Sequence, residues 1–255
     1  MTEYTHENIS RDFEKRQKFL SQESLEDLAG LLDSTYLKPD ANWKENIQIL
    51  CQDAFKHGFA SVCIPPSFVK QASDFFASLD KQVDVCTVIG FPLGYSSTVA
   101  KTAEIERAIA DGAEEIDFVQ NVTLVKESNW TELHREFKEV VSASQGKLTK
   151  VILETSLLTQ QEIMACAKAA LEEGVSTVKT STGFGSRGAS LEDMEIIASV
   201  TKSFQEEHGK LAGIKASGGV RSIEDAKKML AAGATRLGTS NAVAIIQRLT
   251  TSGSY

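Results

Sequence analysis

The sequence has few of the residues that mark secreted or metal-binding proteins. Its 255 residues include four cysteines and four histidines. The cysteines form no C-x-x-C pair and are too sparse for a disulfide framework, so we interpret them as reduced thiols. The histidines never occur at the H-x-x-x-H spacing that places two imidazoles on one helical face. We therefore expect no metal and no other cofactor.

Long apolar runs and an excess of positive charge are also missing. No segment approaches the roughly 18 apolar residues that span a bilayer, and the polar N-terminus does not resemble a signal peptide. The formal net charge is -8, with a pI near 5.2. Such a surface repels polyanions, so nucleic acid is not an expected partner. The sequence predicts a cytoplasmic protein that contacts neither membranes nor nucleic acid.

Short runs rich in β-branched residues recur along the chain, and each is followed by a segment with helical spacing. A chain of this length with 42% hydrophobic residues suits one α/β domain. We predict a (β/α)₈ TIM barrel with an extra N-terminal helix, and strands that are nearly continuous apolar runs. The eight predicted strands begin near residues 31, 61, 83, 114, 150, 175, 211 and 235.

The domain organisation follows from where this pattern starts and stops. Residues 1–26 are polar and compatible with a helix that either packs across one barrel end or frays in solvent. Residues 27–250 form the predicted barrel, and residues 251–255 form a mobile tail without periodic apolar residues.

Polar residues gather where the predicted strands end. In a barrel these positions meet at the C-terminal face, where catalytic and binding groups are found. A barrel needs none of them for its stability, so they are the candidate site residues. The candidates are Asp33, Thr35, Cys63, Asp117, Lys179, Thr182 and Lys215.

Two lysines on adjacent strands are the most informative of these candidates. A lone lysine at a strand end is most often a solvated rim residue. A second cation nearby disfavours the protonated form of an amine, and only the free amine attacks a carbonyl. Lys179 and Lys215 provide this arrangement. Asp117 either shuttles protons or simply neutralises a lysine, and the residues alone favour neither.

Glycine-rich turns after the seventh and eighth strands indicate a phosphate site, because each precedes a helix whose N–H groups can hold an anion. Either turn alone is as readily explained by tight chain reversal. The turns contain Gly218, Gly219 and Gly238, with Ser240 and Arg221 beside them. The segment GFGSRG at 183–188 matches G-x-G-x-x-G, but the next strand ends in a lysine where a dinucleotide fold has an acidic residue.

Longer motifs resemble deoxyribose-phosphate aldolases, a family of class I, Schiff-base aldolases. VKTSTGF at 178–184, KASGGVR at 215–221 and GAEEIDFVQN at 112–121 carry the resemblance. LLDSTYLKPD, SVCIPP, VIGFPLG, KVILET and RLGTSN are similar to the family's other strand motifs in the same order. Ser34, Tyr36, Thr123, Leu124 and Asn241 depart from the family pattern.

The resemblance implies an enzyme of deoxyribose phosphate catabolism that acts on a sugar phosphate and an aldehyde. It implies that Lys179 forms the Schiff base, that Lys215 favours its free amine, and that Asp117 assists proton transfer. Gly183, Gly218, Gly219 and Ser240 would bind phosphate. By analogy the chain would form a homodimer. The alternatives are another Schiff-base aldolase or a barrel that binds a sugar phosphate without turnover.

The C-terminal Tyr255 follows a flexible SGS spacer. We expect either a disordered tail or a phenol that folds over the pocket and assists proton transfer, as the resemblance allows.

Overall fold

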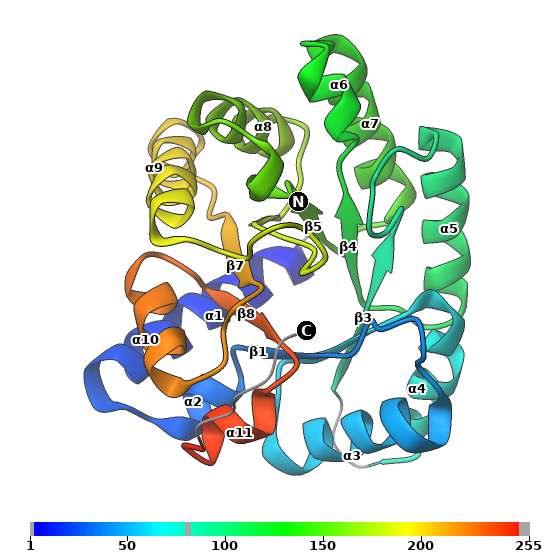
Figure 1. Ribbon diagram of the computed structural model, residues 1–255, viewed down its shortest axis with the longest axis vertical. Coiled ribbons are helices and arrows are strands. Elements are labelled where there is room, and N and C mark those ends of the chain that lie inside the picture. Colours follow the sequence, from blue (N-terminus) through cyan, green and yellow to red (C-terminus); the bar gives the residue numbers. More distant parts are fainter. Residues whose placement is uncertain (1–2, 80–82, 250–255) are drawn as a thin grey trace.

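Eight parallel strands form a closed barrel in the computed structural model, which describes residues 3–79 and 83–249 (Figure 1). Each strand pairs with its neighbour in sequence, and β1 closes the ring on β8. This confirms the predicted TIM barrel. The strands are β1 Leu32–Thr35, β2 Ser61–Ile64, β3 Asp84–Ile89, β4 Glu115–Val119, β5 Leu148–Ile152, β6 Thr177–Lys179, β7 Gly213–Ser217 and β8 Arg236–Thr239.

Helices surround the strands as an outer ring (Figure 1). Most begin at a Ser, Thr or Asn whose side chain accepts a hydrogen bond from the first turn, as Thr159 and Ser222 do in complete capping boxes. No helix of the described residues is long and apolar enough to cross a membrane. The first helix, α1, spans Glu3–Gln22. The helices after it are α2 Leu25–Ala29, η1 Trp43–Ile47, α3 Gln48–His57, η2 Pro66–Phe68, α4 Val69–Ala77, α5 Thr98–Ala110, α6 Val122–Lys126, α7 Trp130–Ala143, η3 Thr155–Leu157, α8 Gln160–Glu172, α9 Leu191–His208, α10 Ile223–Ala231 and α11 Ala242–Ile246.

The strands have an apolar outer face and, in several cases, a charged inner face. In β4, Ile116 and Phe118 pack in the main hydrophobic core, while Glu115 and Asp117 bond to side chains of other strands. The same alternation places Val151 outside and Lys150 inside on β5. The expectation of nearly continuous apolar runs is therefore wrong for these strands, because the barrel interior holds ion pairs.

Helix α1, Glu3–Gln22, lies across the N-terminal end of the barrel. Its Ile9 and Phe19 are buried, and Asp12 pairs with Arg236, the first residue of β8. The Arg16 Nε donates to the Leu230 carbonyl at 2.7 Å. The predicted N-terminal helix is thus confirmed, and it packs across one barrel end. The proposed domain boundaries stay a prediction, and the tail at 251–255 lies outside the described residues.

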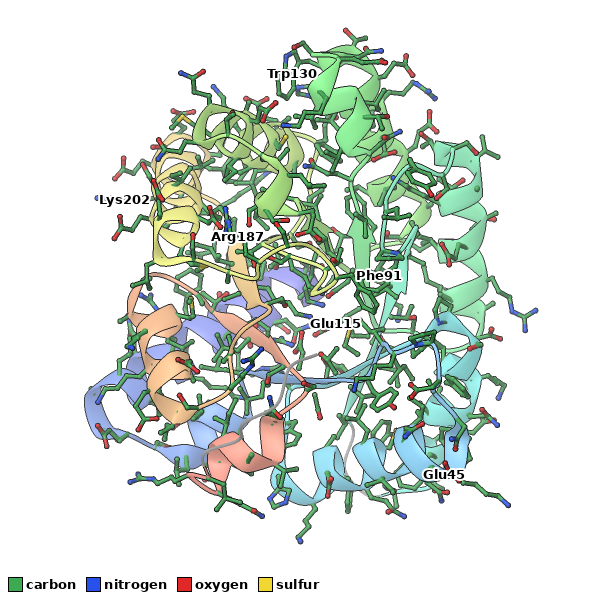
Figure 2. All side chains as sticks on the ribbon, in the orientation of Figure 1. Glu45, Phe91, Glu115, Trp130, Arg187 and Lys202 are labelled. Carbon is green, nitrogen blue, oxygen red and sulfur yellow. The ribbon has the colours of Figure 1, made fainter. Side chains whose placement is uncertain are left out.

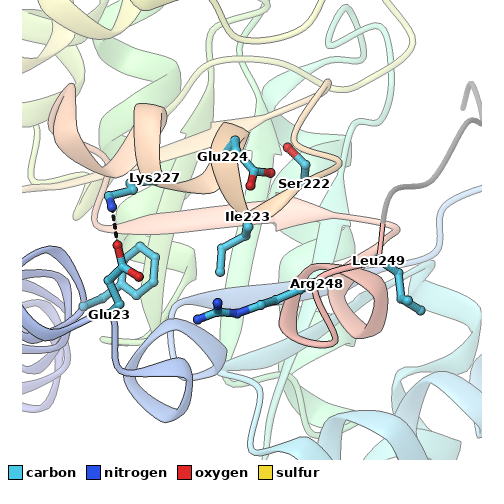
Figure 3. A pocket seen from close by; sticks show the side chains of 8 residues that line it. Glu23, Ser222, Ile223, Glu224, Lys227, Arg248 and Leu249 are labelled. Carbon is cyan, nitrogen blue, oxygen red and sulfur yellow. Dashed lines mark hydrogen bonds and ion pairs between the residues drawn. The ribbon is translucent and has the colours of Figure 1, made fainter.

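The C-terminal end of α1 contacts α10. Glu23 forms an ion pair with Lys227 beside a pocket of about 280 Å³ (Figure 3). Phe19, Ile223 and Arg248 also line it. The pocket contains none of the candidate site residues, so it belongs to the packing of α1 against the outer ring.

A buried ion pair joins α5 to α7 behind the end of β4. The Lys101 Nζ donates to Glu136 Oε2 and to the Val119 carbonyl, each at 2.8 Å. The other oxygen of Glu136 accepts from the Asn121 backbone N–H at 2.9 Å. Burial raises the pKa of Glu136 and lowers the pKa of Lys101 against the effect of the pairing. The ion pair therefore fixes the position of the end of β4, although burying its two charges costs desolvation energy.

Replacing Lys101 tests this role. We expect Lys101→Met to lower the free energy of unfolding by about 3–5 kcal/mol, because it leaves the buried Glu136 carboxylate without its cation. The double variant K101M/E136Q should recover most of the loss, since no buried charge then remains. Guanidinium denaturation measures both. As a control, Lys70→Met breaks an exposed pair and should change stability by less than about 1 kcal/mol. Equal losses in the single and double variants would contradict the account.

Candidate active site

The two predicted lysines are direct neighbours in the barrel wall. Lys179 on β6 and Lys215 on β7 are register partners. Both Nζ atoms lie 2.7 Å from the same atom, Oδ2 of Asp117 on β4. Lys179 is 3% exposed, and the other two side chains are fully buried. The structure thus brings together the three residues that the sequence singled out for catalysis.

Asp117 also binds a third lysine, which the sequence analysis did not select. The Lys150 Nζ lies 2.7 Å from Oδ1 of Asp117 and 2.6 Å from Oε2 of Glu115. Burial alone raises the pKa of Asp117, but the three surrounding lysines outweigh it and hold the pKa well below its usual range. Asp117 is therefore an ionised carboxylate at the centre of three lysine side chains.

Lys215 is held by two carboxylates. It contacts Asp33 on β1 as well as Asp117. Burial lowers the pKa of Lys215, but Asp117 and Asp33 outweigh that effect and keep the pKa well above the ordinary value. Lys215 is thus a permanent cation next to Lys179. Asp33 itself is fully buried, and its Oδ1 lies 2.8 Å from Nη1 of Arg236.

These contacts extend through the barrel interior. Arg236 also lies 3.1 Å from Glu115 and 2.9 Å from Asp12, and Glu115 lies near the barrel centre in Figure 2. We call these eight side chains the barrel charge cluster. It consists of the carboxylates of Asp12, Asp33, Glu115 and Asp117 and the cations Lys150, Lys179, Lys215 and Arg236. The cluster thus contains four acidic and four basic side chains.

Four members of the cluster were missed from sequence, namely Asp12, Glu115, Lys150 and Arg236. A usable signal existed for three of them. Lys150, Glu115 and Arg236 are charged residues within strand segments, where most barrels have branched apolar side chains. No sequence signal distinguishes Asp12 from the other charged residues of its helix.

The loops that follow β3, β5 and β6 contact one another beyond the ends of these strands. The Thr182 backbone N–H donates to Glu154 Oε2 at 3.2 Å, and its hydroxyl contacts the same oxygen. Phe91, which is labelled in Figure 2, packs edge to face against Phe184, with ring centroids 5.4 Å apart. Thr182 is buried rather than lining an open surface. Thr35 is also buried, and its hydroxyl donates to the Asp33 carbonyl at 2.9 Å.

The glycine-rich loops pack backbone against backbone. A Cβ on Gly218, which has φ +79°, would come within 2.8 Å of Gly188 Cα. A Cβ on Gly185 would come within 2.6 Å of Glu154 Oε1. The G-x-G-x-x-G segment is thus a loop of the barrel, and its glycines allow neighbouring loops to approach closely. It does not belong to a dinucleotide-binding fold. Gly183 adjoins the same contact and has φ +90°.

The remaining predicted phosphate residues have different surroundings. A Cβ on Gly219 would meet no described atom within 4 Å, so the backbone there faces open space. Ser240 and Arg221 are exposed. Gly238 is buried against Ser217, where a Cβ would lie 2.2 Å from Oγ. Gly219, Arg221 and Ser240 are therefore accessible to a ligand, whereas Gly238 serves packing.

Cys63, Cys86 and Asp117 are the described group with metal-ligating atoms, all within 4.8 Å of one another. Asp117 already bonds to three lysines, and Cys86 Sγ donates to its Oδ1 at 3.1 Å. The neighbouring ammonium groups would repel a metal cation. Cys63, a predicted site residue, is fully buried, so its thiol is not exposed at the surface.

This arrangement suits amine chemistry. Lys179 is the lysine of the cluster with the fewest carboxylate partners and the largest exposed fraction. Residues 27–247 match the family described as DeoC/LacD family aldolase. The chain belongs to this family.

Relatives in this aldolase family match nearly the whole chain. It is 44% identical over 232 residues to the deoxyribose-phosphate aldolase of Carboxydothermus hydrogenoformans, which covers 89% of this chain and 97% of that one. The deoxyribose-phosphate aldolase of Bdellovibrio bacteriovorus is 43% identical over 228 residues, covering 89% and 99%. A solved aldolase structure from Aeropyrum pernix, described as a unique tetrameric structure of deoxyribose phosphate aldolase, has a TM-score of 0.80 and 33% identity, covering 91% and 95%.

The ion pairs of Asp117 predict a pH-dependent contribution to stability. We expect Asp117→Asn to lower the free energy of unfolding by about 3–5 kcal/mol at pH 7, because three buried ammonium groups lose their shared carboxylate. Because the pKa of Asp117 is lowered in the folded state, its ionised carboxylate contributes its full stabilisation at pH values above the ordinary pKa of 3.8. The gap between wild type and variant should therefore narrow by about 1.4 kcal/mol per pH unit below 3.8. Urea denaturation at pH 7 and pH 3 measures the gap.

The matched control is Asp74→Asn, which removes an exposed carboxylate and should change stability little at either pH. A gap for Asp117→Asn that is the same at both pH values would mean that the carboxylate is not held ionised by the lysines.

Proposed function

We propose that this protein is a deoxyribose-phosphate aldolase, a lyase that reversibly cleaves 2-deoxy-D-ribose 5-phosphate into D-glyceraldehyde 3-phosphate and acetaldehyde. The single observation that carries the proposal is the sharing of one Asp117 oxygen by Lys179 and Lys215 at 2.7 Å. A barrel that only binds a sugar phosphate gains nothing from two buried lysines on one carboxylate. The relatives with this name support the substrate.

The chemistry begins at Lys179. Its neutral amine attacks the C1 aldehyde of the open-chain sugar, and loss of water from the carbinolamine gives a protonated imine. A base removes the C3 hydroxyl proton, the C3–C4 bond breaks, and its electron pair passes into the imine to form an enamine. Glyceraldehyde 3-phosphate leaves. Protonation of the enamine carbon and hydrolysis release acetaldehyde and restore the amine.

Asp117 and Lys215 supply the proton transfers. Asp117 accepts bonds from both lysines, so with an intervening water it can orient the relay that carries away the C3 hydroxyl proton. Lys215 stays cationic and so favours the unprotonated form of its neighbour. Asp33 is buried between Lys215 and Arg236, so it contributes by holding Lys215 in place.

The phosphate end of the substrate binds at the glycine-rich loops. Gly219, Arg221 and Ser240 are exposed there, next to the close contact of Gly188 with Gly218, and Gly183 lies beside that contact. Backbone N–H groups at such turns hold phosphate well. Thr35, Cys63, Thr182 and Gly238 are buried, so they shape the pocket wall.

We also propose a cytoplasmic homodimer whose partners are the small-molecule sugar phosphate and aldehyde. The four buried, unpaired cysteines fit a reducing compartment. The relative from Aeropyrum pernix is described as tetrameric, so assembly differs from protein to protein or exceeds a dimer here.

Borohydride trapping tests the proposed function. We expect 2-deoxyribose 5-phosphate with borohydride to add one reduced sugar-derived adduct per chain, located on Lys179 by peptide mass spectrometry. Lys179→Leu should abolish both the adduct and cleavage, since no free amine then reaches the carbonyl. Lys168→Leu, which removes an exposed lysine on α8, is the control and should retain full activity.

Other outcomes of the trapping experiment would each favour a different function or a different assignment of the lysines. An adduct on Lys215 would exchange the roles of the two lysines. Trapping by other phosphorylated aldehydes or keto acids, without cleavage of deoxyribose phosphate, would favour another Schiff-base aldolase. Neither trapping nor cleavage would favour a binding-only barrel.

Tyr255 lies outside the described residues, and its role is a separate proposal. A phenol at the mouth would protonate the enamine carbon. We expect deletion of Tyr255 to slow the exchange of acetaldehyde methyl protons with solvent deuterium, measured by proton NMR, while borohydride trapping on Lys179 persists. Unchanged exchange would make the tail dispensable.

A further inference from the structure

The barrel charge cluster continues beyond the strands into helix α1. Nε and Nη2 of Arg236 donate to the same oxygen of Asp12, at 3.0 and 2.9 Å. Nη1 of Arg236 bonds to Asp33, and Asp33 contacts Lys215. Asp12 is therefore connected to the catalytic end of the barrel through three successive ion pairs.

Asp12 is placed at a cost that packing alone does not explain. Its side chain is 7% exposed, and Oδ1 is buried without a hydrogen-bond partner among the described residues. Burial raises the pKa of Asp12, and Arg236 only partly opposes that effect. Apolar residues in place of a whole buried ion pair are often equally stable, so covering a barrel end does not by itself require Asp12 and Arg236.

Asp12 also completes the charge balance. Without it, the cluster has three carboxylates and four cations, and one uncompensated positive charge acts on all of them through a medium of low dielectric constant. Lys179 has a single carboxylate partner in the cluster, whereas Lys150 and Lys215 each have two.

We propose that Asp12 is a positioning residue for the aldolase reaction, acting through Arg236, Asp33 and Lys215 to set the pH range in which Lys179 is a free amine. The proposal rests on the proposed function. It gives helix α1, which lies outside the residues that match the aldolase family, a role in catalysis beyond covering the barrel.

Other charged groups surround Asp12. Arg11 and Lys15 lie on α1 itself, and Glu115 approaches from β4. Asp84 on β3 is close to Arg236 and Glu115, and burial, followed by Glu115, raises its pKa to about 6. These groups are unchanged in the Asp12 variants, so the effect of Asp12 is the difference between the wild-type and variant profiles over one pH range.

The experiment compares pH profiles of kcat/KM for deoxyribose phosphate cleavage in the full chain. For Asp12→Asn we expect the acid limb to move to lower pH by about 0.5 unit, because an added positive charge favours the free amine of Lys179. Asp12→Glu keeps the charge and should keep the wild-type position. Arg236→Gln removes a cation and should move the limb to higher pH.

Two control variants separate charge from packing. Glu14→Gln removes an exposed carboxylate from the same helix, so it makes the same change in net charge outside the cluster. Ile9→Ala weakens the packing of α1 without changing any charge. Both should leave the acid limb in place, although Ile9→Ala should lower thermal stability.

An acid limb that is unmoved in Asp12→Asn, or moved equally in Ile9→Ala, would overturn the proposal and leave Asp12 a structural residue. Circular dichroism shows whether each variant folds. If Asp12→Asn does not fold, Arg236→Gln decides, and an unmoved limb there overturns the proposal. A wild-type chain that cleaves no deoxyribose phosphate overturns the proposed function and this inference together.

Discussion

The structure depends on the ion pairs of one carboxylate. Asp117 lies within 2.7 Å of the Nζ atoms of Lys150, Lys179 and Lys215 in the interior of the barrel. Burying any of these charges alone would cost several kcal/mol, and each is tolerated only because its partners are in place. The same condition that allows the lysines to be buried also brings two amines close to one acid. Stability and chemistry therefore rest on the same contacts.

Much of the surrounding fold keeps Asp117 and its partners in register. Parallel pairing places Lys179 beside Lys215 and Asp117 beside Lys150. Behind the end of β4, Lys101 and Glu136 fix the Val119 carbonyl and the Asn121 N–H. At the opposite end, α1 closes the barrel and extends the cluster to Asp12. A rigid scaffold of this kind preorganises charged groups before substrate arrives.

The barrel and its two site lysines could be predicted from the sequence, because they depend on local patterns. Recurring β-branched runs, each followed by a segment with helical spacing, predicted the eight strands, and the positions of Lys179 and Lys215 at adjacent strand ends implied their proximity. The rest of the cluster depends on closure of the ring. Asp12 and Arg236 are 224 residues apart in the chain, and no local pattern relates them. Lys150 was overlooked because a charge within a strand has meaning only when the strand's inner face is known.

The glycine-rich loops after β7 and β8 were likewise predicted only in part from the sequence. Glycine content predicted tight turns after β7 and β8, and the structure explains Gly218 and Gly238 by close packing against Gly188 and Ser217. Among the predicted phosphate residues, Gly219, Arg221 and Ser240 are exposed. Sequence composition cannot separate glycines that permit packing from glycines that expose backbone, because both occur in the same motif.

The most direct test of the account is the ionisation state of Asp117, followed by carboxyl ¹³C NMR of aspartate-labelled protein with Asp117→Asn used to assign the signal. The account predicts that this carboxyl stays ionised as the pH falls below 3.8, until the protein unfolds. An Asp117 signal that titrates at or above the ordinary aspartate pKa in the folded protein would contradict the charge cluster on which the structure and its chemistry are proposed to depend.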